Sequence, residues 1–111
     1  KDFHLIRPAG GHADNRVLSL YRSTFINWTA SLDTSDWQDT TTENDIYNTV
    51  ISNLIDGGIV LMHQGYDKSI KAVKRLLPEL KTLGYQVVSV SELIKYYNVE
   101  AEIGKLYDCF I

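Results

Sequence analysis

Hydrophobic positions along the chain alternate between short continuous runs and stretches with helical spacing. The short runs are rich in aliphatic, aromatic and β-branched residues, which predicts strands near residues 4–7, 25–32, 58–63 and 85–90. Between these runs the apolar residues recur every three or four positions, as on a helix with one buried face. Strands that alternate with helices predict an α/β fold built on a parallel sheet.

Residues that cap helices mark where the predicted helices begin, namely Asp14, Thr42, Asp67 and Ser91. The third helix carries the strongest apolar stripe and contains Pro78, which lacks the backbone N–H that a helix interior needs. We therefore expect this helix to kink or split at Pro78. Its predicted inner side consists of Ile70, Val73, Leu76, Leu77, Leu80 and Leu83.

Length and composition describe one small globular domain. The chain has 111 residues, of which 44% are hydrophobic and 23% charged, so intrinsic disorder is not expected. We interpret residues 1–97 as one domain and residues 98–111, which have weak helical periodicity, as a helical tail. Lys1 stands where an initiator methionine would be expected, which suggests a piece of a longer protein.

The charge and the cysteine content exclude several classes of protein. A formal net charge of −3 with 11 Lys and Arg residues argues against a nucleic-acid binder that relies on a basic surface. The single cysteine excludes a disulfide within the chain and any multi-cysteine zinc site. The longest apolar run, at 59–62, is too short to span a bilayer.

Three places with candidate chemistry follow predicted strands, and the carboxyl ends of parallel strands meet at one edge of a sheet. In Arg7–Gly11 the guanidinium could hold a carboxylate and the glycine N–H groups could stabilise an oxyanion, or the segment is a simple tight turn. Asp33–Trp37 could orient a base beside an apolar pocket, or form a solvated acidic loop. His63 is a candidate general acid or base, or a core histidine.

Taken in order, these three motifs resemble the polysaccharide deacetylases of carbohydrate esterase family 4. Arg-Pro-x-Gly-Gly at 7–11 is similar to the third motif of that family, Asp-x-x-Asp-Trp at 33–37 to the fourth, and Leu-x-His at 61–63 to the fifth. The resemblance covers roughly residues 3–95 and implies that the chain is the C-terminal half of an irregular (β/α) barrel. An independent flavodoxin-like domain is a weaker interpretation, because the first predicted strand ends in Arg7–Pro8 rather than in acidic residues.

The resemblance also implies a role for each matching residue. His63 would be the general acid that protonates the leaving amine, and Asp33 would hydrogen-bond and orient it. Arg7 would pair with a catalytic aspartate outside this chain, and the backbone N–H of Gly10 would donate to the oxyanion. Trp37 and Leu61 would line the pocket for the acetyl methyl group, whereas Asp36 receives no role from the motif.

The family motifs that bind a metal, Thr-Phe-Asp-Asp and His-x-x-x-His, do not occur in this sequence. The resemblance thus implies a divalent metal, with zinc as the first candidate, and the residues that hold it are not in this chain. It further implies an amino-sugar polymer such as peptidoglycan or chitin as substrate, and an extracellular or cell-envelope location in a bacterium. We expect the chain to be inactive alone and to pair with the missing half or with a second copy.

A non-enzymatic alternative remains open at this point. The chain could be a truncated or degenerate deacetylase-like domain that binds glycan or a partner chain without catalysis.

Overall fold

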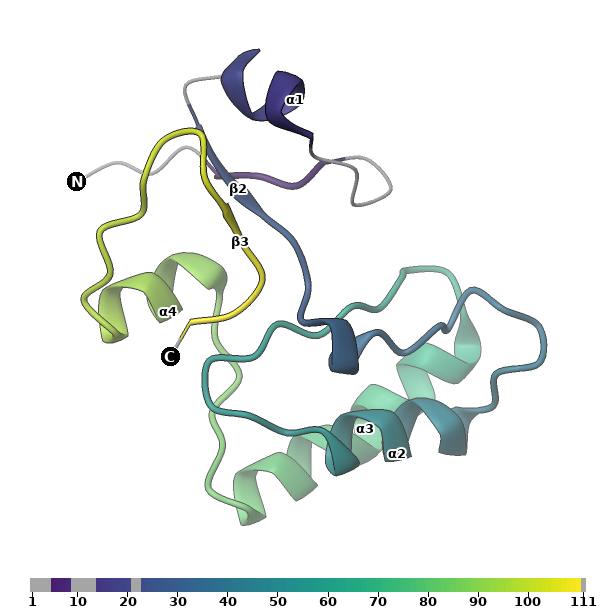
Figure 1. The fold of residues 1–111 in the computed structure, drawn as a ribbon. Coiled ribbons are helices and arrows are strands. Elements are labelled where there is room, and N and C mark those ends of the chain that lie inside the picture. Colours follow the sequence, from purple (N-terminus) through teal and green to yellow (C-terminus); the bar gives the residue numbers. More distant parts are fainter. Residues whose placement is uncertain (1–4, 9–13, 21–22, 111) are drawn as a thin grey trace.

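A sheet of three short parallel strands forms the upper part of the molecule (Figure 1). The computed structural model describes residues 5–8, 14–20 and 23–110. Strand β1 (Leu5–Ile6) pairs with β2 (Thr24–Ile26), and β2 pairs with β3 (Leu106–Tyr107), so the order is β1-β2-β3. All three residues of β2 are buried, as expected for the central strand of a covered sheet. The prediction of a parallel α/β fold is confirmed.

The tail of the chain belongs to this sheet, and the helix predicted over 98–111 is wrong for the described residues. Gly104 adopts a φ of +78° and turns the chain toward β2. The N–H of Phe25 then donates to the carbonyl of Lys105 at 2.9 Å, and the N–H of Asn27 donates to that of Tyr107 at 2.8 Å. The apolar residues of the tail have nearly helical spacing, but pairing with β2 satisfies more backbone groups in a segment this short.

Helices α2 (Glu43–Ser52) and α3 (Asp67–Thr82) pack side by side in the lower part of the molecule (Figure 1). The predicted cap Thr42 forms a reciprocal capping box with Asp45, which explains where α2 begins. Helix α3 continues through Pro78 without a break, contrary to the predicted split. Pro78 lies on the exposed side, where the carbonyl that loses its donor can bind water instead.

The buried side of α3 agrees only in part with the predicted one. Ser69, Ala72, Leu76 and Leu80 are buried, whereas Ile70 and Leu77 are about half exposed. Leu76 and Leu80 pack with Val50 of α2 in one core cluster. Leu76 and Leu80 are thus buried as predicted, whereas three of the six predicted inner residues are exposed, Leu83 being the third at 48%.

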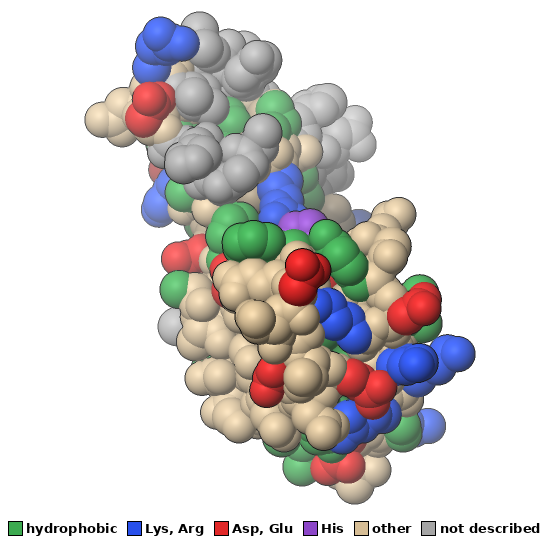
Figure 2. Space-filling model, turned by 90° about the vertical axis from the view of Figure 1, so that its right-hand side faces the viewer, with side chains coloured by type: hydrophobic (Ala, Val, Ile, Leu, Met, Phe, Trp, Pro, Cys, Tyr) green, Lys and Arg blue, Asp and Glu red, His purple; other side chains and the backbone are tan. Residues whose placement is uncertain are grey.

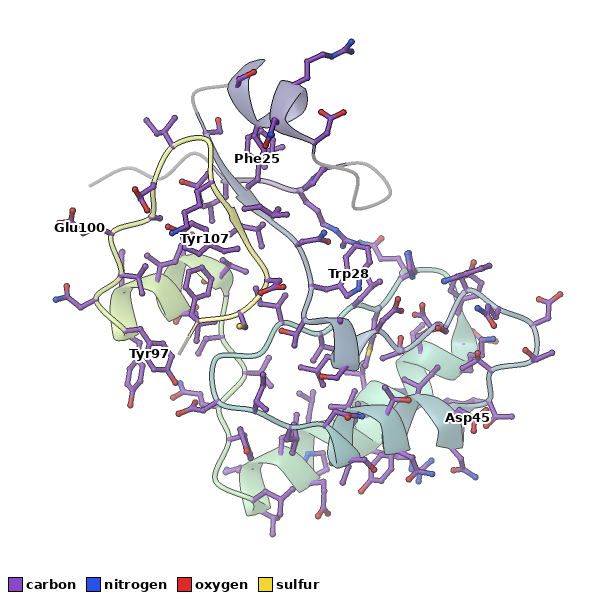
Figure 3. The ribbon with its side chains drawn as sticks, in the orientation of Figure 1. Phe25, Trp28, Asp45, Tyr97, Glu100 and Tyr107 are labelled. Carbon is purple, nitrogen blue, oxygen red and sulfur yellow. The ribbon has the colours of Figure 1, made fainter. Side chains whose placement is uncertain are left out.

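Helix α4 (Val90–Tyr96) covers the sheet next to β3 (Figure 1). Its cap is Ser89, which forms a capping box with Glu92, rather than the predicted Ser91. Residues 85–89 form no regular strand, contrary to prediction. Buried Ile26, Ile94 and Phe110 form a second core cluster between α4 and the sheet. Tyr107, on β3, stacks on Phe110 at this position (Figure 3).

Two shorter elements complete the described part of the chain. Helix α1 (Asn15–Leu20) begins after Asp14, whose carbonyl accepts the N–H of Leu18. A single 3₁₀ turn, η2 (Ala30–Leu32), replaces the end of the predicted strand 25–32. Among the described residues, no helix combines the length and the apolar character needed to cross a bilayer.

The 57–61 segment joins the sheet region to the lower part of the molecule. The N–H of Phe110 donates to the carbonyl of Gly57 at 2.8 Å, and Gly58 forms an antiparallel bridge with Cys109. Asp33 and Leu61 form a parallel bridge on the other side of this segment. Residues 58–63 therefore form no regular strand, contrary to prediction, but only these two isolated bridges, with His63 two residues after the second.

We predict that Gly57→Ala strongly destabilises the fold, whereas Gly84→Ala has a small effect. Both glycines have positive φ, +83° and +86°, so alanine would be strained at either position by about 1 kcal/mol. A Cβ at Gly57 would lie 1.3 Å from the carbonyl oxygen of Phe110, but one at Gly84 would meet nothing within 4 Å. Urea denaturation measures the difference, and equal losses of stability would contradict the packing seen at Gly57.

Candidate functional site

The candidate site lies where the 33–37 loop meets the end of the 59–63 segment. The parallel bridge between Asp33 and Leu61 sets these two parts of the chain side by side. Thr34 reinforces the bridge, because its buried hydroxyl donates to the carbonyl of Leu61 at 2.8 Å. The predicted meeting of the Asp33–Trp37 loop with His63 is therefore present in the structure.

A buried carboxylate organises this meeting point. Asp36 is fully buried, and its Oδ1 lies 2.7 Å from Nδ1 of His63. Its Oδ2 accepts two further hydrogen bonds, from the backbone N–H of His63 at 2.6 Å and from the hydroxyl of Ser69 at 2.7 Å. The carboxylate thus binds the loop, the histidine and helix α3 together, and both of its oxygens have partners, as a buried charge requires.

The balance of interactions lowers the pKa of Asp36. Burial by itself would raise the pKa of this carboxyl group. The hydrogen bonds from the His63 side chain, the His63 backbone and Ser69 act in the opposite direction and outweigh it, so the net pKa lies below 3.8. Asp36 is therefore a carboxylate at neutral pH and accepts hydrogen bonds from all three donors.

The hydrogen-bond partner of His63 is Asp36, not Asp33 as the sequence motif implied. Oδ1 of Asp33 instead accepts the backbone N–H of Ser35 at 3.0 Å, which is the geometry of an Asx turn. Ser35 has a φ of +52°, an uncommon backbone conformation for a residue other than glycine. Asp33 thus shapes the turn from which Asp36 reaches the imidazole.

His63 is accessible at the surface while its Nδ1 edge is held from inside. Its side chain is 42% exposed, compared with 0% for Asp36. Among the described residues His63 is the one histidine, so it is the purple side chain in Figure 2. Hydrophobic side chains lie on both sides of it, and a basic side chain lies next to it. Contact between Nδ1 and the carboxylate favours the tautomer that carries the proton on Nδ1. Nε2 is then the ring nitrogen that can exchange a proton with a ligand.

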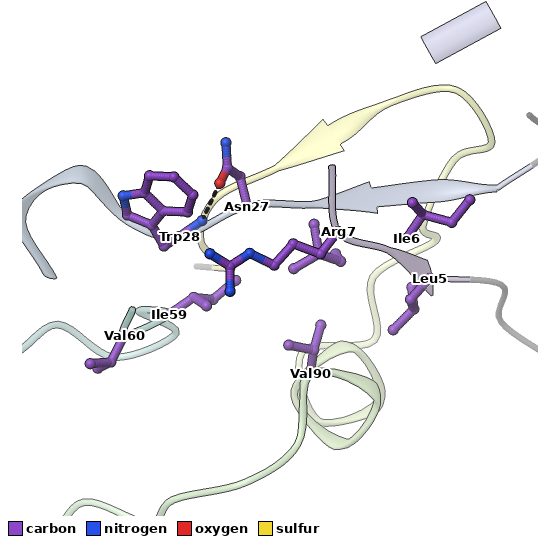
Figure 4. Close-up of a pocket in the computed structure, with 9 residues that line it drawn as sticks. Leu5, Ile6, Arg7, Asn27, Trp28, Ile59, Val60 and Val90 are labelled. Atoms are coloured by element: carbon purple, nitrogen blue, oxygen red, sulfur yellow. Dashed lines mark hydrogen bonds between the residues drawn. The ribbon is translucent and has the colours of Figure 1, made fainter. Parts of the chain in front are cut away.

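The other predicted site residues have different surroundings. Leu61 is buried under the 33–37 loop, whereas the side chain of Trp37 is 55% exposed. Arg7 lies at the end of β1 with its guanidinium 5.1 Å from the ring centroid of Trp28, a cation–π contact (Figure 4). Gly10 lies outside the described residues, so its predicted role as an oxyanion donor stays a prediction.

Arg7 and Trp28 border an open pocket of about 300 Å³ (Figure 4). The rest of its lining is mostly aliphatic and comes from β1, β2, the 59–60 segment and the start of α4. Trp37 and Leu61 do not line this pocket, so the structure does not bring them together there as an acetyl pocket. The guanidinium of Arg7 is the charged group of this lining. The pocket is therefore suited to bind a partner that carries an apolar group next to a carboxylate.

Sequence reasoning missed three residues of this region: Asp36, Ser69 and Trp28. Asp36 was part of a matched motif, and only the contact geometry shows which of its two acids reaches His63. A serine within a helical stripe that is otherwise apolar was an available signal for Ser69, because buried hydroxyl groups need a partner. Trp28 carries no such signal, since an aromatic residue near a strand end is ordinary core material.

We predict that the stabilising effect of Asp36 disappears in acid. Its pKa is lowered in the folded protein, so the stabilisation is complete above the ordinary value of 3.8 and is lost as the pH falls through the folded-state pKa. The difference in Tm between wild type and Asp36→Asn should therefore be largest above about pH 5 and shrink below pH 3.8. Asp39→Asn, at an exposed position just after the 33–37 loop, is the matched control. A difference that stays constant down to the acid transition would refute the assignment.

Comparison with curated proteins identifies relatives over most of this chain. It is 36% identical over 98 residues to a peptidoglycan-N-acetylglucosamine deacetylase of Bacillus cereus, matching 83% of this chain and 46% of the relative. It is 31% identical over 102 residues to the peptidoglycan-N-acetylglucosamine deacetylase PgdA of Listeria monocytogenes, matching 92% of this chain and 21% of that protein. The chain thus spans less than half the length of these relatives. No family model matches it.

Solved structures give the same result for the fold. A T48 deacetylase solved with substrate superposes with a TM-score of 0.84 at 27% identity, over 95% of this chain and 50% of the other. The Xyl-CE4 domain of a multidomain xylanase superposes with a TM-score of 0.86 at 25% identity, over 98% of this chain and 53% of the other. The three motifs occur in the order expected for the family, and the 33–37 loop lies against the segment that carries His63. Together with these relatives, this shows that the chain belongs to the polysaccharide deacetylases of carbohydrate esterase family 4 and corresponds to about half of such a domain.

Proposed function

We propose that this chain is the part of a polysaccharide N-deacetylase that supplies the general acid and the oxyanion donor. The reaction is hydrolysis of N-acetyl groups on an amino-sugar polymer, either peptidoglycan or a chitin-like glycan. The two relatives described above are named as deacetylases of peptidoglycan N-acetylglucosamine, which supports this substrate class. The observation that carries the proposal is the 2.7 Å contact between the buried Asp36 carboxylate and Nδ1 of His63.

The geometry suits His63 to protonate a leaving amine. In amide hydrolysis, water adds to the acetyl carbon, the C–N bond breaks, and the sugar nitrogen must gain a proton to leave as an amine. Nδ1 of His63 is engaged by Asp36, so Nε2 is the atom that would donate this proton. With both of its oxygens bonded, Asp36 fixes the ring in one orientation, and fixed orientation is a large part of such catalysis. Asp33 contributes indirectly, because it stabilises the turn at Ser35 that positions Asp36.

Arg7 and Gly10 complete the proposed half-site. The guanidinium of Arg7, held over Trp28, would pair with a carboxylate from the part of the domain that this chain does not span. The backbone N–H of Gly10 would donate to the developing oxyanion, a contribution on the order of 3 kcal/mol in hydrolases where such donors were removed. Trp37, whose side chain is exposed, would contribute apolar surface toward the acetyl group, whereas the buried Leu61 would act only by supporting the 33–37 loop.

The described residues do not by themselves fit a metal. They contain no group of three or more His, Cys, Asp or Glu side chains that could hold an ion. The divalent metal that the family resemblance implies, zinc in the first place, would therefore be bound by residues outside the described part of this chain. The same reasoning makes the remaining half of the domain, or a second copy of the chain, the expected protein partner. An extracellular or cell-envelope location follows from a peptidoglycan-type substrate.

Acetate release from an acetylated chitooligosaccharide tests this function. The 111-residue chain should release none, whereas the chain extended by the remaining half of the domain, as in its Bacillus cereus relative, should be active. In the extended protein, His63→Ala should lower kcat roughly 10²–10⁴-fold because the leaving amine loses its acid. Asp36→Asn should also be strongly impaired, but Asp33→Asn should be mild, because an asparagine oxygen can still accept the Ser35 N–H.

Rates are compared per folded molecule, with folding checked by circular dichroism. Normal turnover in His63→Ala would remove this residue from the mechanism. An extended protein that binds the oligosaccharide but releases no acetate would favour the alternative, a glycan-binding domain without catalysis.

A further inference from the structure

Ser69 is the polar member of the buried side of helix α3, which otherwise consists of apolar residues. A hydroxyl group within a helix commonly donates to the carbonyl one turn earlier, as Thr82 of the same helix does to Pro78 at 3.0 Å. The hydroxyl of Ser69 instead leaves the helix and donates to Oδ2 of Asp36 at 2.7 Å. Since a buried hydroxyl is costly unless it is hydrogen-bonded, this contact explains why a serine is acceptable at that position.

The three donors to Asp36 have different origins. Two of them, the backbone N–H and the ring of His63, belong to the histidine itself and would move with it. Ser69 is the donor that comes from another element, so it relates the carboxylate to the framework of α3. The terminal torsion of an aspartate is broad, and the carboxylate could turn about its Cβ–Cγ bond without a second fixed partner. Ser69 therefore limits the rotation of the group that orients the imidazole.

Lys68, the residue before Ser69, holds the chain at a second point beyond Asp36. Its Nζ donates to the carbonyl of Gln38 at 2.5 Å and to that of Thr41 at 2.9 Å. Both carbonyls belong to the turns that continue the 33–37 loop, so the first turn of α3 and this part of the chain are joined at two places. The hydroxyl of Ser69 thus comes from a backbone that is already fixed relative to Asp36, and its hydrogen bond requires little additional ordering.

We propose that Ser69 is a positioning residue for the deacetylation step, because its hydroxyl sets the rotation of the Asp36 carboxylate and thereby the direction of Nε2 of His63. This inference rests on the proposed function, which makes His63 the general acid. Without the hydroxyl, Asp36 keeps its two hydrogen bonds to the histidine, but carboxylate and ring can turn together away from the leaving nitrogen. Ser69 is buried and does not face a substrate, so its loss affects kcat rather than KM.

Acetate release by the extended protein, expressed per folded molecule, tests the role of Ser69. Ser69→Ala should lower kcat about 10-fold and leave KM within about 2-fold of the wild type. Ser69→Thr should retain kcat because the hydroxyl remains, whereas Ser69→Val, which has the shape of threonine without a donor, should lose as much as Ser69→Ala. Thr82→Ala is the matched control, because it removes a hydroxyl from the same helix that donates to a carbonyl and not to Asp36. Its kcat should equal that of the wild type.

An NMR measurement on the 111-residue chain tests the same role without turnover. The proton on Nδ1 of His63 should exchange with water about 10-fold faster in Ser69→Ala than in the wild type, and at the wild-type rate in Ser69→Thr. Unchanged exchange in Ser69→Ala would overturn the proposal, as would a normal kcat in that variant or equal losses of kcat in Ser69→Thr and Ser69→Val. The proposed function fails by a different result, the absence of acetate release from the extended wild-type protein, and the exchange rates then still decide the role of Ser69.

Discussion

The buried carboxylate of Asp36 is the interaction on which the candidate site depends. A charged group without exposure to water is costly unless each oxygen is hydrogen-bonded, and here three donors from two segments meet that requirement. Two of the donors belong to His63, so the histidine is fixed both in backbone and in ring. The third, Ser69, belongs to the first turn of α3, so the site and the helix are held by one group.

This constraint explains features that otherwise look unrelated. Helix α3 turns Ser69 inward, where its hydroxyl donates to Asp36, on the same side as the buried Leu76 and Leu80, while Ile70 and Leu77 are half exposed. The 33–37 loop tolerates a positive φ at Ser35, because Asp33 binds the N–H of that residue and directs the next turn toward the imidazole. Strain of this kind persists only where the surrounding contacts over-determine the backbone.

Sequence periodicity and capping patterns predicted the parallel α/β class and the start of α2 and α3, because both are local properties of the chain. The same local patterns were wrong for the tail, because β3 forms only by pairing with β2, which lies about 80 residues earlier in the chain. For α3 they were right for Leu76 and Leu80 but wrong for Ile70 and Leu77, and they did not place Ser69 on the inner side, where it donates to Asp36.

The motif residues show the same division. The order of Arg7, the 33–37 loop and His63 along the chain indicated the family, which the relatives confirm. Which of two aspartates reaches the imidazole depends on a turn of five residues, and motif spacing does not contain that information. The contact of Arg7 with Trp28 could only be found in three dimensions.

Proton-detected ¹⁵N NMR of the His63 ring tests the central claim, that Asp36 holds Nδ1 of the histidine, most directly. The account predicts a proton on Nδ1 with the downfield shift of a short hydrogen bond to a carboxylate. This signal should disappear in Asp36→Asn and persist in Asp33→Asn. A signal that survives in Asp36→Asn, or that is lost in Asp33→Asn while the protein stays folded, would contradict the account.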